Sequence, residues 1–345
     1  RFRMHRSSLG CIQSYFCAAI IIIISGCSNS VESISDDSQI ATTPADSVNQ
    51  YIYNHPNHLP SLIIRGRRYL NNANLPYANA DADAVLELDS LNHDGLLLKG
   101  EANYLSNSTR ISRDYWLKCI KNHPLETDCR LKLAELYSIV LEYEKSNELV
   151  NKVIDLSPNN SIAFFIKGMN IRDTKGDTAL SLGYIQKSID LDPNYFAAID
   201  MAAVMLAAQK NSLALSYYNR LLELQPNNSD TYYKIGMFNL SSSQYNGALE
   251  AFTKSTQINP NDAESFFNMG YIHLELGLLT EARNLFSKSI EARAINHRAF
   301  YGRGFCWERG GDLINAEKDY SQALSLNPQH KPSEEALFRV RNGLK

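Results

Sequence analysis

Apolar, small and polar positions recur along this chain with a period close to 34 residues, from residue 59 to residue 330. A proline closes most periods, and successive prolines are separated by 34, 35, 33, 34 and 68 residues. These prolines are Pro124, Pro158, Pro193, Pro226, Pro260 and Pro328. A period of this length is typical of proteins in which one supersecondary unit is stacked many times. It divides residues 59–330 into eight units with nothing left over.

Within each period, the pattern predicts two helices that cross closely. The first helix has a small residue at its eighth position: Gly66, Gly100, Ala134, Gly168, Ala203, Gly236, Gly270 and Gly304. The second has one near its start: Ala78, Ser112, Ser146, Ser181, Ala214, Ala248, Ala282 and Ala316. Four residues later a larger apolar side chain follows in seven units, and Ala82 stands there in the first: Trp116, Val150, Ile185, Tyr218, Phe252, Phe286 and Tyr320. Proline ends the second helix, and the Asn or Asp after it is suited to cap the next one. One hairpin cannot bury its own core, so neighbours must stack.

This arrangement resembles the tetratricopeptide repeat, most closely in the unit that contains Tyr232, Ile235, Gly236, Ala248, Phe252 and Pro260. Ser90 and Ala294 replace the terminal proline in two units. The resemblance implies an all-α fold, a right-handed superhelix (α-solenoid) of eight helix-turn-helix repeats. The expected repeats are 59–92, 93–126, 127–160, 161–195, 196–228, 229–262, 263–296 and 297–330. Residues 331–345 are expected to form a C-terminal capping helix, with Ser333 as its N-cap and Ala336, Leu337, Val340 and Leu344 against the last repeat.

The N-terminal segment has the features of an export signal. Basic Arg1, Arg3 and Arg6 precede an apolar run of nine residues that is too short to cross a membrane. The following Ser25-Gly26-Cys27 resembles the bacterial lipobox, which implies cleavage after residue 26 and a lipid on Cys27; the alternative is a plain secretory signal. We therefore expect a signal peptide at 1–26 and a flexible tether at 27–58, with a short helix near 47–53. The expected location is the bacterial cell envelope, anchored by lipid, and Ser28 favours the outer membrane.

The rest of the sequence offers little chemistry. The composition is that of an ordered protein, 44% hydrophobic and 21% charged, and a net charge of −3 gives no reason to expect nucleic acid. No nucleotide-binding, nucleophile-elbow or zinc-protease motif is found, so we predict no catalytic residue, no cofactor and no metal. His55 and His58 are expected to be solvated in the tether, as are the histidines near repeat turns, His93, His123, His297 and His330. Cys119, Cys129 and Cys306 are expected to be buried free thiols, with a Cys119–Cys129 disulfide as the alternative.

A binding surface is the remaining candidate. In the family, positions of the first helices that the hairpin core does not use line the concave face. Here these positions carry Phe165, Met169, Val204, Tyr233, Met237, Phe267, Tyr271, Tyr301 and Phe305. Aromatic residues and Met are enriched at protein interfaces, although a helical apolar stripe is also typical of a core. The Lys, Asn and Arg set that some members use to grip a carboxylate terminus is absent.

The predicted function is that of a lipid-anchored scaffold or adaptor that binds proteins or peptides at this face and the membrane through Cys27. The alternatives are an adaptor for a cell-wall hydrolase or protease, an assembly component of a secretion or pilus machine and, least favoured, an enzyme. Arg65, Arg67 and Arg68 of the first repeat are expected to form a solvated basic edge.

Overall fold

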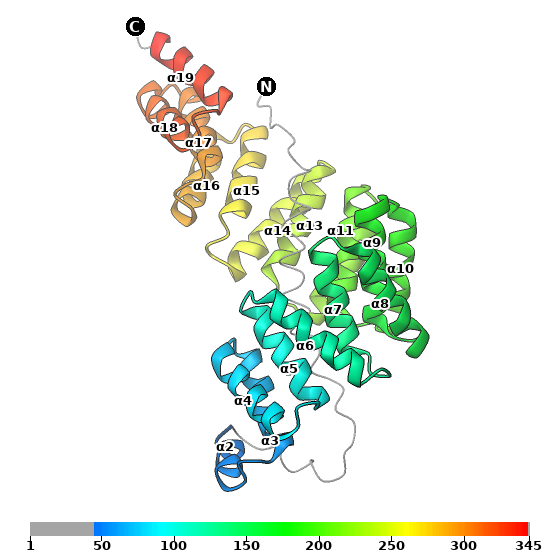
Figure 1. The fold of residues 1–345 in the computed structure, drawn as a ribbon. Coiled ribbons are helices and arrows are strands. Elements are labelled where there is room, and N and C mark those ends of the chain that lie inside the picture. Colours follow the sequence, from blue (N-terminus) through cyan, green and yellow to red (C-terminus); the bar gives the residue numbers. More distant parts are fainter. Residues whose placement is uncertain (1–44, 344–345) are drawn as a thin grey trace. The chain divides into compact units, whose positions relative to one another are not determined.

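The computed structural model describes residues 45–343, and in this range the chain is all-α, with helices packed in pairs (Figure 1). This confirms the predicted fold class. The predicted signal peptide, Cys27 and Leu344 lie outside the described residues. Two compact units are present, one up to Ala202 and one from Ala203, and each is described by itself. None of the described helices is long and apolar enough to cross a membrane.

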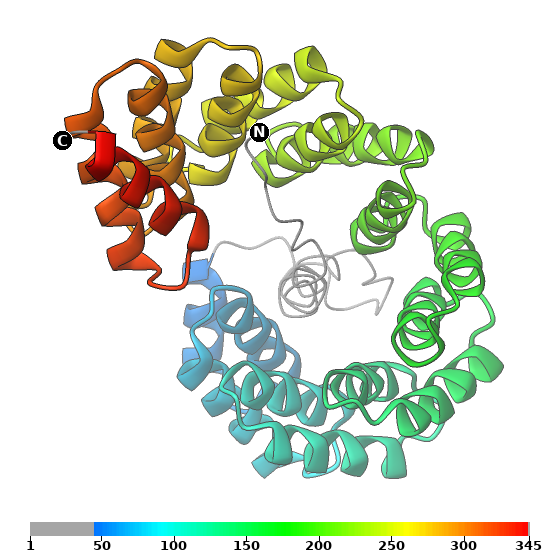
Figure 2. The ribbon, with the colours of Figure 1, turned by 90° about the horizontal axis from the view of Figure 1, so that it is seen from above.

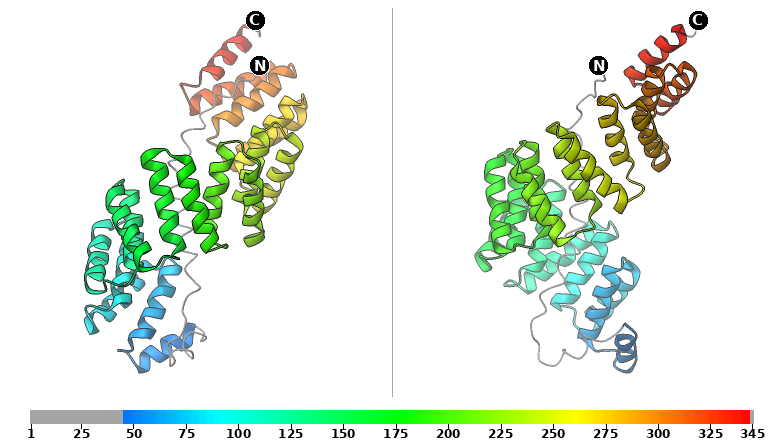
Figure 3. Two further views of the ribbon diagram at one scale, coloured as in Figure 1. Left: turned by 90° about the vertical axis from the view of Figure 1, so that its right-hand side faces the viewer. Right: turned by 180° about the vertical axis from the view of Figure 1, so that it is seen from behind.

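The first unit is a row of helical hairpins that follows a short N-terminal helix, drawn in blue to green in Figure 3. Its helices are α2 (Ala45–Asn54), α3 (Leu59–Asn71), α4 (Leu75–Leu88), α5 (His93–Leu105), α6 (Thr109–Asn122), α7 (Asp128–Ile139), α8 (Tyr143–Leu156), α9 (Ser161–Lys175) and α10 (Thr178–Leu191). From α3 to α10, each helix packs against the next in sequence, and α3, α5, α7 and α9 also contact one another in order. The first helices of successive hairpins therefore form one layer of the row.

The second unit repeats this arrangement toward the C-terminus, in yellow-green to red in Figure 2. The helix α11 (Phe196–Ala208) contains the boundary between the units. It is followed by α12 (Leu213–Leu224), α13 (Ser229–Ser241), α14 (Tyr245–Ile258), α15 (Ala263–Glu275), α16 (Leu279–Ala292), α17 (His297–Arg309), α18 (Leu313–Leu326) and α19 (Lys331–Gly343). Each helix from α12 onward contacts the next one along the chain.

Small residues set the distance at which paired helices cross, as the sequence predicts. A Cβ atom added to Gly100 would lie 2.2 Å from Nε1 of Trp116, and one added to Gly236 would lie 2.5 Å from Cε1 of Phe252. Gly270 is similarly close to the Phe286 ring, at 3.0 Å. The aromatic side chain of the second helix thus occupies the space that the missing side chain of the first helix leaves.

The predicted helix caps are also confirmed. The side chains of Asn92, Asn160, Asn228, Asp262 and Asn296 each accept a hydrogen bond from the backbone N–H three residues later. Each of these residues begins the first helix of a hairpin. Because an unpaired N–H at a helix start is satisfied in this way, the short Asn- or Asp-containing turn fixes where these five hairpins begin.

The segment before the first hairpin differs from the expectation of a flexible tether up to residue 58. Residues 45–54 form α2, which contains the short helix predicted near 47–53, and its Val48 and Ile52 are buried against Leu62 and Val85. His58 caps α3, and its Nδ1 lies 2.7 Å from Oγ of Ser61. These contacts pack this stretch onto the first hairpin, so His58 is part of the fold and is not simply solvated.

At the other end, α19 covers the last hairpin. Its Ala336 and Val340 are buried together with Ala316 and Tyr320. The helix begins at Lys331, the first residue of the predicted capping helix, so Ser333 lies inside the first turn. Its hydroxyl is 2.7 Å from Nδ1 of His330. Ser333 is therefore a buried partner of His330 and not the N-cap.

Cys119 and Cys129 form a disulfide in the first unit, whereas buried free thiols were the favoured expectation. Cys119 is in the last turn of α6, and Cys129 is in the first turn of α7. The connection between the two helices brings their Cα atoms to 6.3 Å, within the range that a disulfide spans. Cys306 is a buried free thiol, as predicted, and burial raises its pKa to about 12.

Candidate protein-binding surface

The residue directly after the small packing residue of each first helix differs in polarity between the early and the late hairpins. In the first three hairpins this position carries a charge, on Arg67, Glu101 and Glu135. In the later hairpins it carries an apolar side chain, on Met169, Val204, Met237, Tyr271 and Phe305. The sequence prediction included the apolar set but not the charged one. The repeat spacing could have identified the charged residues, because they directly follow the small packing residues Gly66, Gly100 and Ala134.

In the second unit, five aromatic and Met side chains of the predicted groove remain accessible, beside Val204. Met237 is 39% exposed, and the other four are partly exposed. We call this set the aromatic face: Tyr233, Met237, Tyr271, Tyr301 and Phe305. Each tyrosine of the set either packs its ring against the second helix of its hairpin or has a partly buried hydroxyl group. The Tyr233 ring is 5.9 Å from that of Phe252, and burial raises the pKa of Tyr271 and Tyr301.

Phe267 was predicted for the groove, but it is only 1% exposed. Its ring packs at 5.6 Å from that of Phe286 on one side. On another side, the Arg298 guanidinium, which comes from the next hairpin, lies 4.1 Å from the ring centroid. This cation–π contact covers the ring, so Phe267 belongs to the core of the unit and offers little surface to a partner.

Two further predicted groove residues are buried in the first unit. Phe165 is 3% exposed and packs edge-on against Tyr195, with ring centroids 5.4 Å apart. Met169 is 6% exposed. Val204, in the second unit, is partly exposed. The groove residues predicted on α9 therefore serve packing, and the accessible part of the predicted groove is the aromatic face together with Val204.

The charged residues of the first unit form a cluster on α3, α5 and α7, which we call the charged cluster: Arg67, Glu101, Lys132 and Glu135. Lys132 Nζ lies 3.4 Å from Glu101 and 3.9 Å from Glu135, and Arg67 lies 3.7 Å from Glu101. The carboxylates border a small recess lined by Leu70, Tyr104 and Trp116. Burial is the main reason that the pKa of Glu135 is raised, and the nearby Glu101 acts in the same direction.

Arg65 and Arg67 of the predicted basic edge form ion pairs, contrary to the expectation of a solvated face. Arg65 donates to both carboxylate oxygens of Asp81, at 2.6 and 2.9 Å, and Asp81 is buried. The last hairpin contains the same arrangement, in which Arg303 donates to both oxygens of Asp319 at 2.8 Å. In each case the residues are 16 apart and join the two helices of one hairpin. These hydrogen bonds are the main reason that the pKa of each guanidinium is raised.

Two histidines meet where the last hairpin joins α19. The rings of His297 and His330 are 5.1 Å apart, edge to face, and the Tyr301 ring is 5.2 Å from that of His330. Asn327 Nδ2 lies 3.2 Å from His297 Nε2. Burial lowers the pKa of both histidines. They are therefore part of the packed junction, which differs from the expectation that they are solvated.

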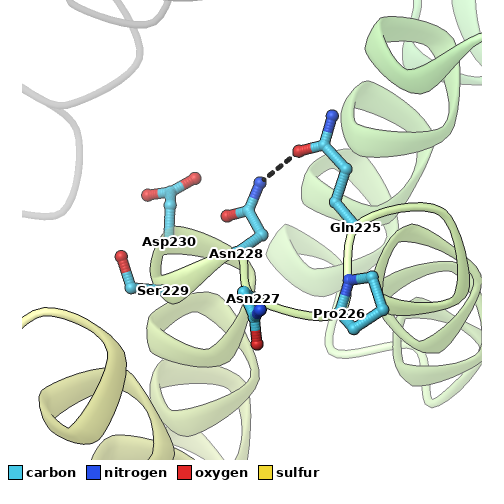
Figure 4. Close-up of a pocket in the computed structure, with 6 residues that line it drawn as sticks. All are labelled: Gln225, Pro226, Asn227, Asn228, Ser229 and Asp230. Atoms are coloured by element: carbon cyan, nitrogen blue, oxygen red, sulfur yellow. Dashed lines mark hydrogen bonds between the residues drawn. The ribbon is translucent and has the colours of Figure 1, made fainter.

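A polar hollow lies at the turn before α13, between Gln225 and Asp230 (Figure 4). In this turn, Nδ2 of Asn228 donates to Oε1 of Gln225 at 3.0 Å, and Asn228 also caps α13. The hollow is open and its groups are used by the turn itself. It is a product of the connection between hairpins, and we assign no binding role to it.

The stacked hairpins with side chains displayed from the first helices define the class of protein, an α-solenoid of the kind that presents a surface to other proteins. Family models described as TPR repeat and tetratricopeptide repeat match residues 239–277 and 267–331. Residues 239–331 therefore match tetratricopeptide repeats, and repeats of this kind act as scaffolds for protein–protein interaction. No curated protein sequence matches the chain.

Solved structures share the fold at low sequence identity. The C-terminal part of a TPR repeat-containing protein from Cytophaga hutchinsonii is 15% identical with a TM-score of 0.58, over 70% of this chain and 99% of that one. The Cut9–Hcn1 hetero-tetramer of the APC/C gives 14% identity and a TM-score of 0.53, over 89% of this chain and 60% of that one. YrrB, a TPR protein with an unusual peptide-binding site, is 21% identical with a TM-score of 0.45, over 55% of this chain and 98% of that one.

Proposed function

We propose that this chain is an exported scaffold, anchored by a lipid on Cys27 in a bacterial cell envelope, that binds another protein through its aromatic face. The observation that carries the binding role is the partial exposure of five aromatic and Met side chains on the first helices of one unit. An apolar surface of this kind favours contact with apolar side chains of a partner, because aromatic residues and Met are the types enriched at interfaces.

The outer membrane is the membrane that we propose for the anchor. Three basic residues, a short apolar run and Ser25-Gly26-Cys27 support export and lipidation. The Cys119–Cys129 disulfide supports an oxidising compartment, because disulfides are rare in proteins that stay in the cytosol. Ser28, directly after the cysteine, is the feature that favours the outer membrane over the inner one.

Lipid anchoring is tested by replacing Cys27 with Ala in the full chain expressed in a bacterial host. Labelling with a clickable fatty acid should be lost, and the protein should move from the membrane to the soluble fraction, since stable anchoring needs acyl chains. Cys306→Ser is the matched control, because it removes a buried thiol outside the signal and should leave labelling unchanged. Unchanged labelling of the Cys27→Ala variant would show that the lipid is absent or elsewhere.

Partner binding is tested by placing a photo-reactive phenylalanine analogue at Tyr271 or Phe305. Irradiation of living cells should crosslink one discrete partner at these positions. The control is the same analogue at Glu250, an exposed residue on the second helix α14 of the same unit. Equal crosslinking at all three positions would indicate collisions at the surface and would contradict a specific aromatic face.

A further inference from the structure

Three potential metal ligands meet at the junction of α5, α6 and α7. One ring nitrogen of His93 and the sulfur atoms of Cys119 and Cys129 all lie within 4.8 Å of one another. His93 is the first residue of α5, Cys119 lies in the last turn of α6, and Cys129 lies in the first turn of α7. Three separate helices therefore bring one imidazole and two sulfurs to the same point.

The His93 ring is held in a defined orientation. Its Nδ1 is 3.5 Å from Oδ1 of Asp94, and that same oxygen accepts a hydrogen bond from Arg67 at 3.2 Å. Its Nε2 is buried and has no hydrogen-bond partner among the described residues. Because Nδ1 is directed to a carboxylate, Nε2 is the nitrogen that remains for a ligand. A carboxylate on the other nitrogen is the usual means by which proteins orient a histidine that binds a metal.

The surroundings of the two sulfurs suit a soft ligand set. Both cysteines are at most 1% exposed, and they pack with Leu96, Leu97 and Leu133. The His93 side chain is 20% exposed and forms the edge that faces solvent. Thiolate and imidazole together are the ligands that select zinc among the abundant divalent cations.

We propose that Cys119 and Cys129, when reduced, form with His93 a binding site for a thiophilic d10 cation of the Zn²⁺ class, so that the disulfide and the metal exclude each other. A dithiol donor supplies two electrons and two protons to the disulfide and itself becomes a disulfide. Zn²⁺ then displaces the two thiol protons, and the metal does not change its oxidation state. The sulfurs must part to about 3.8 Å, the separation that tetrahedral Zn–S bonds of ~2.3 Å require.

Three protein ligands leave the fourth position of a tetrahedral ion to water or an external ligand. The consequence for the scaffold is that the connection between α6 and α7 is clamped in both redox states, by a covalent bond when oxidised and by a metal when reduced. This inference does not depend on the aromatic face, which lies in the other unit.

The test is a titration of the full chain with Zn²⁺ by calorimetry, in oxidised form and after reduction by a dithiol that is then removed under argon. Co²⁺ serves as the spectroscopic probe, because thiolate ligation gives a sulfur-to-cobalt charge-transfer band. We expect an ion bound at this site only in the reduced chain, loss of the site in Cys119→Ser, and affinity weakened about 10-fold to 100-fold in Asp94→Asn. His93→Gln should weaken binding at least as much, and Cys306→Ser should leave it unchanged.

Circular dichroism of the reduced chain separates loss of folding from loss of binding. If reduction lowers the helical signal, Zn²⁺ should restore it. Three results would overturn the proposal: no thiolate band in the reduced chain, equal binding by the oxidised chain, or unchanged affinity in His93→Gln. Failure of Zn²⁺ to restore a reduced chain that has lost its helices would equally overturn it.

Discussion

The close approach of α5 and α6 at Gly100 allows a quantitative test of the packing. In Gly100→Ala, the added methyl group would lie 2.2, 2.5 and 2.7 Å from three ring atoms of Trp116. The ring is 1% exposed and surrounded by core residues, so it cannot turn away without displacing them. Overpacking of this kind costs about 1–3 kcal/mol, and three contacts place it near the upper end. Alanine regains ~1 kcal/mol of helix propensity, which leaves a net loss of about 2 kcal/mol.

Gly183 provides the matched control in the same unit. It is exposed in the middle of α10, and no atom lies within 4 Å of the position that a Cβ would take. Gly183→Ala should therefore stabilise the unit by about 0.5–1 kcal/mol, because only the propensity term remains. Both substitutions replace Gly by Ala, but Gly100→Ala is expected to lower the free energy of unfolding and Gly183→Ala to raise it.

Thermal unfolding followed by circular dichroism measures the difference, at roughly 2–4 °C for each kcal/mol in a unit of this size. Hydrogen exchange of the α5 and α6 amides locates the effect, since neighbouring repeats need not unfold together. If Gly100→Ala is as stable as Gly183→Ala, the Trp116 ring moves at little cost in free energy. That result would refute the claim that Gly100 is required for the close crossing of α5 and α6.

Three further predictions follow from the contacts of the described residues. Arg303→Lys should destabilise the last hairpin by about 1–3 kcal/mol in urea unfolding, because lysine cannot donate to both oxygens of buried Asp319. Burial lowers the folded-state pKa of His297 and His330, so their contribution to stability is present above pH ~6.5 and is lost as the pH falls through the folded pKa. Hydrogen exchange in α19 should therefore accelerate from pH 7.5 to pH 5, and a double substitution by Gln should remove that change. Reduction of the disulfide without metal should lower the free energy of unfolding of the first unit by about 2–3 kcal/mol in urea unfolding, as closure of its short loop predicts.

The fold could be predicted because its determinants are local and repeated. A small residue on the first helix and a larger apolar residue on the second recur at fixed spacing. The contact that the spacing implies is made at Gly100, Gly168, Gly236, Gly270 and Gly304. The capping residues likewise act within three residues of their own position. Residues that make such short-range contacts lie at fixed separations in the sequence, so the periodicity is enough to predict these contacts.

The binding surface was harder to predict because exposure depends on the neighbouring hairpin. Phe267 and Tyr301 occupy the same place in their repeats, but Phe267 is 1% exposed beneath the Arg298 guanidinium, whereas Tyr301 is partly exposed. The disulfide was only the alternative expectation, for a related reason. Its formation depends on the path between α6 and α7, which the ten-residue separation of Cys119 and Cys129 does not determine.

Adjacent residues of the first helices serve either helix packing or the proposed partner surface, so the two roles can be tested by different substitutions. At Gly270 the constraint is steric, since an added Cβ would lie 3.0 Å from the Phe286 ring. Tyr271, the next residue along the helix, is partly exposed. A change at Tyr271 therefore alters what the surface offers to a partner, whereas a change at Gly270 or at covered Phe267 alters the core. Loss of binding is therefore informative about partner recognition only when an exposed residue such as Tyr271 is changed. Variants of the aromatic face are the ones that report on the partner.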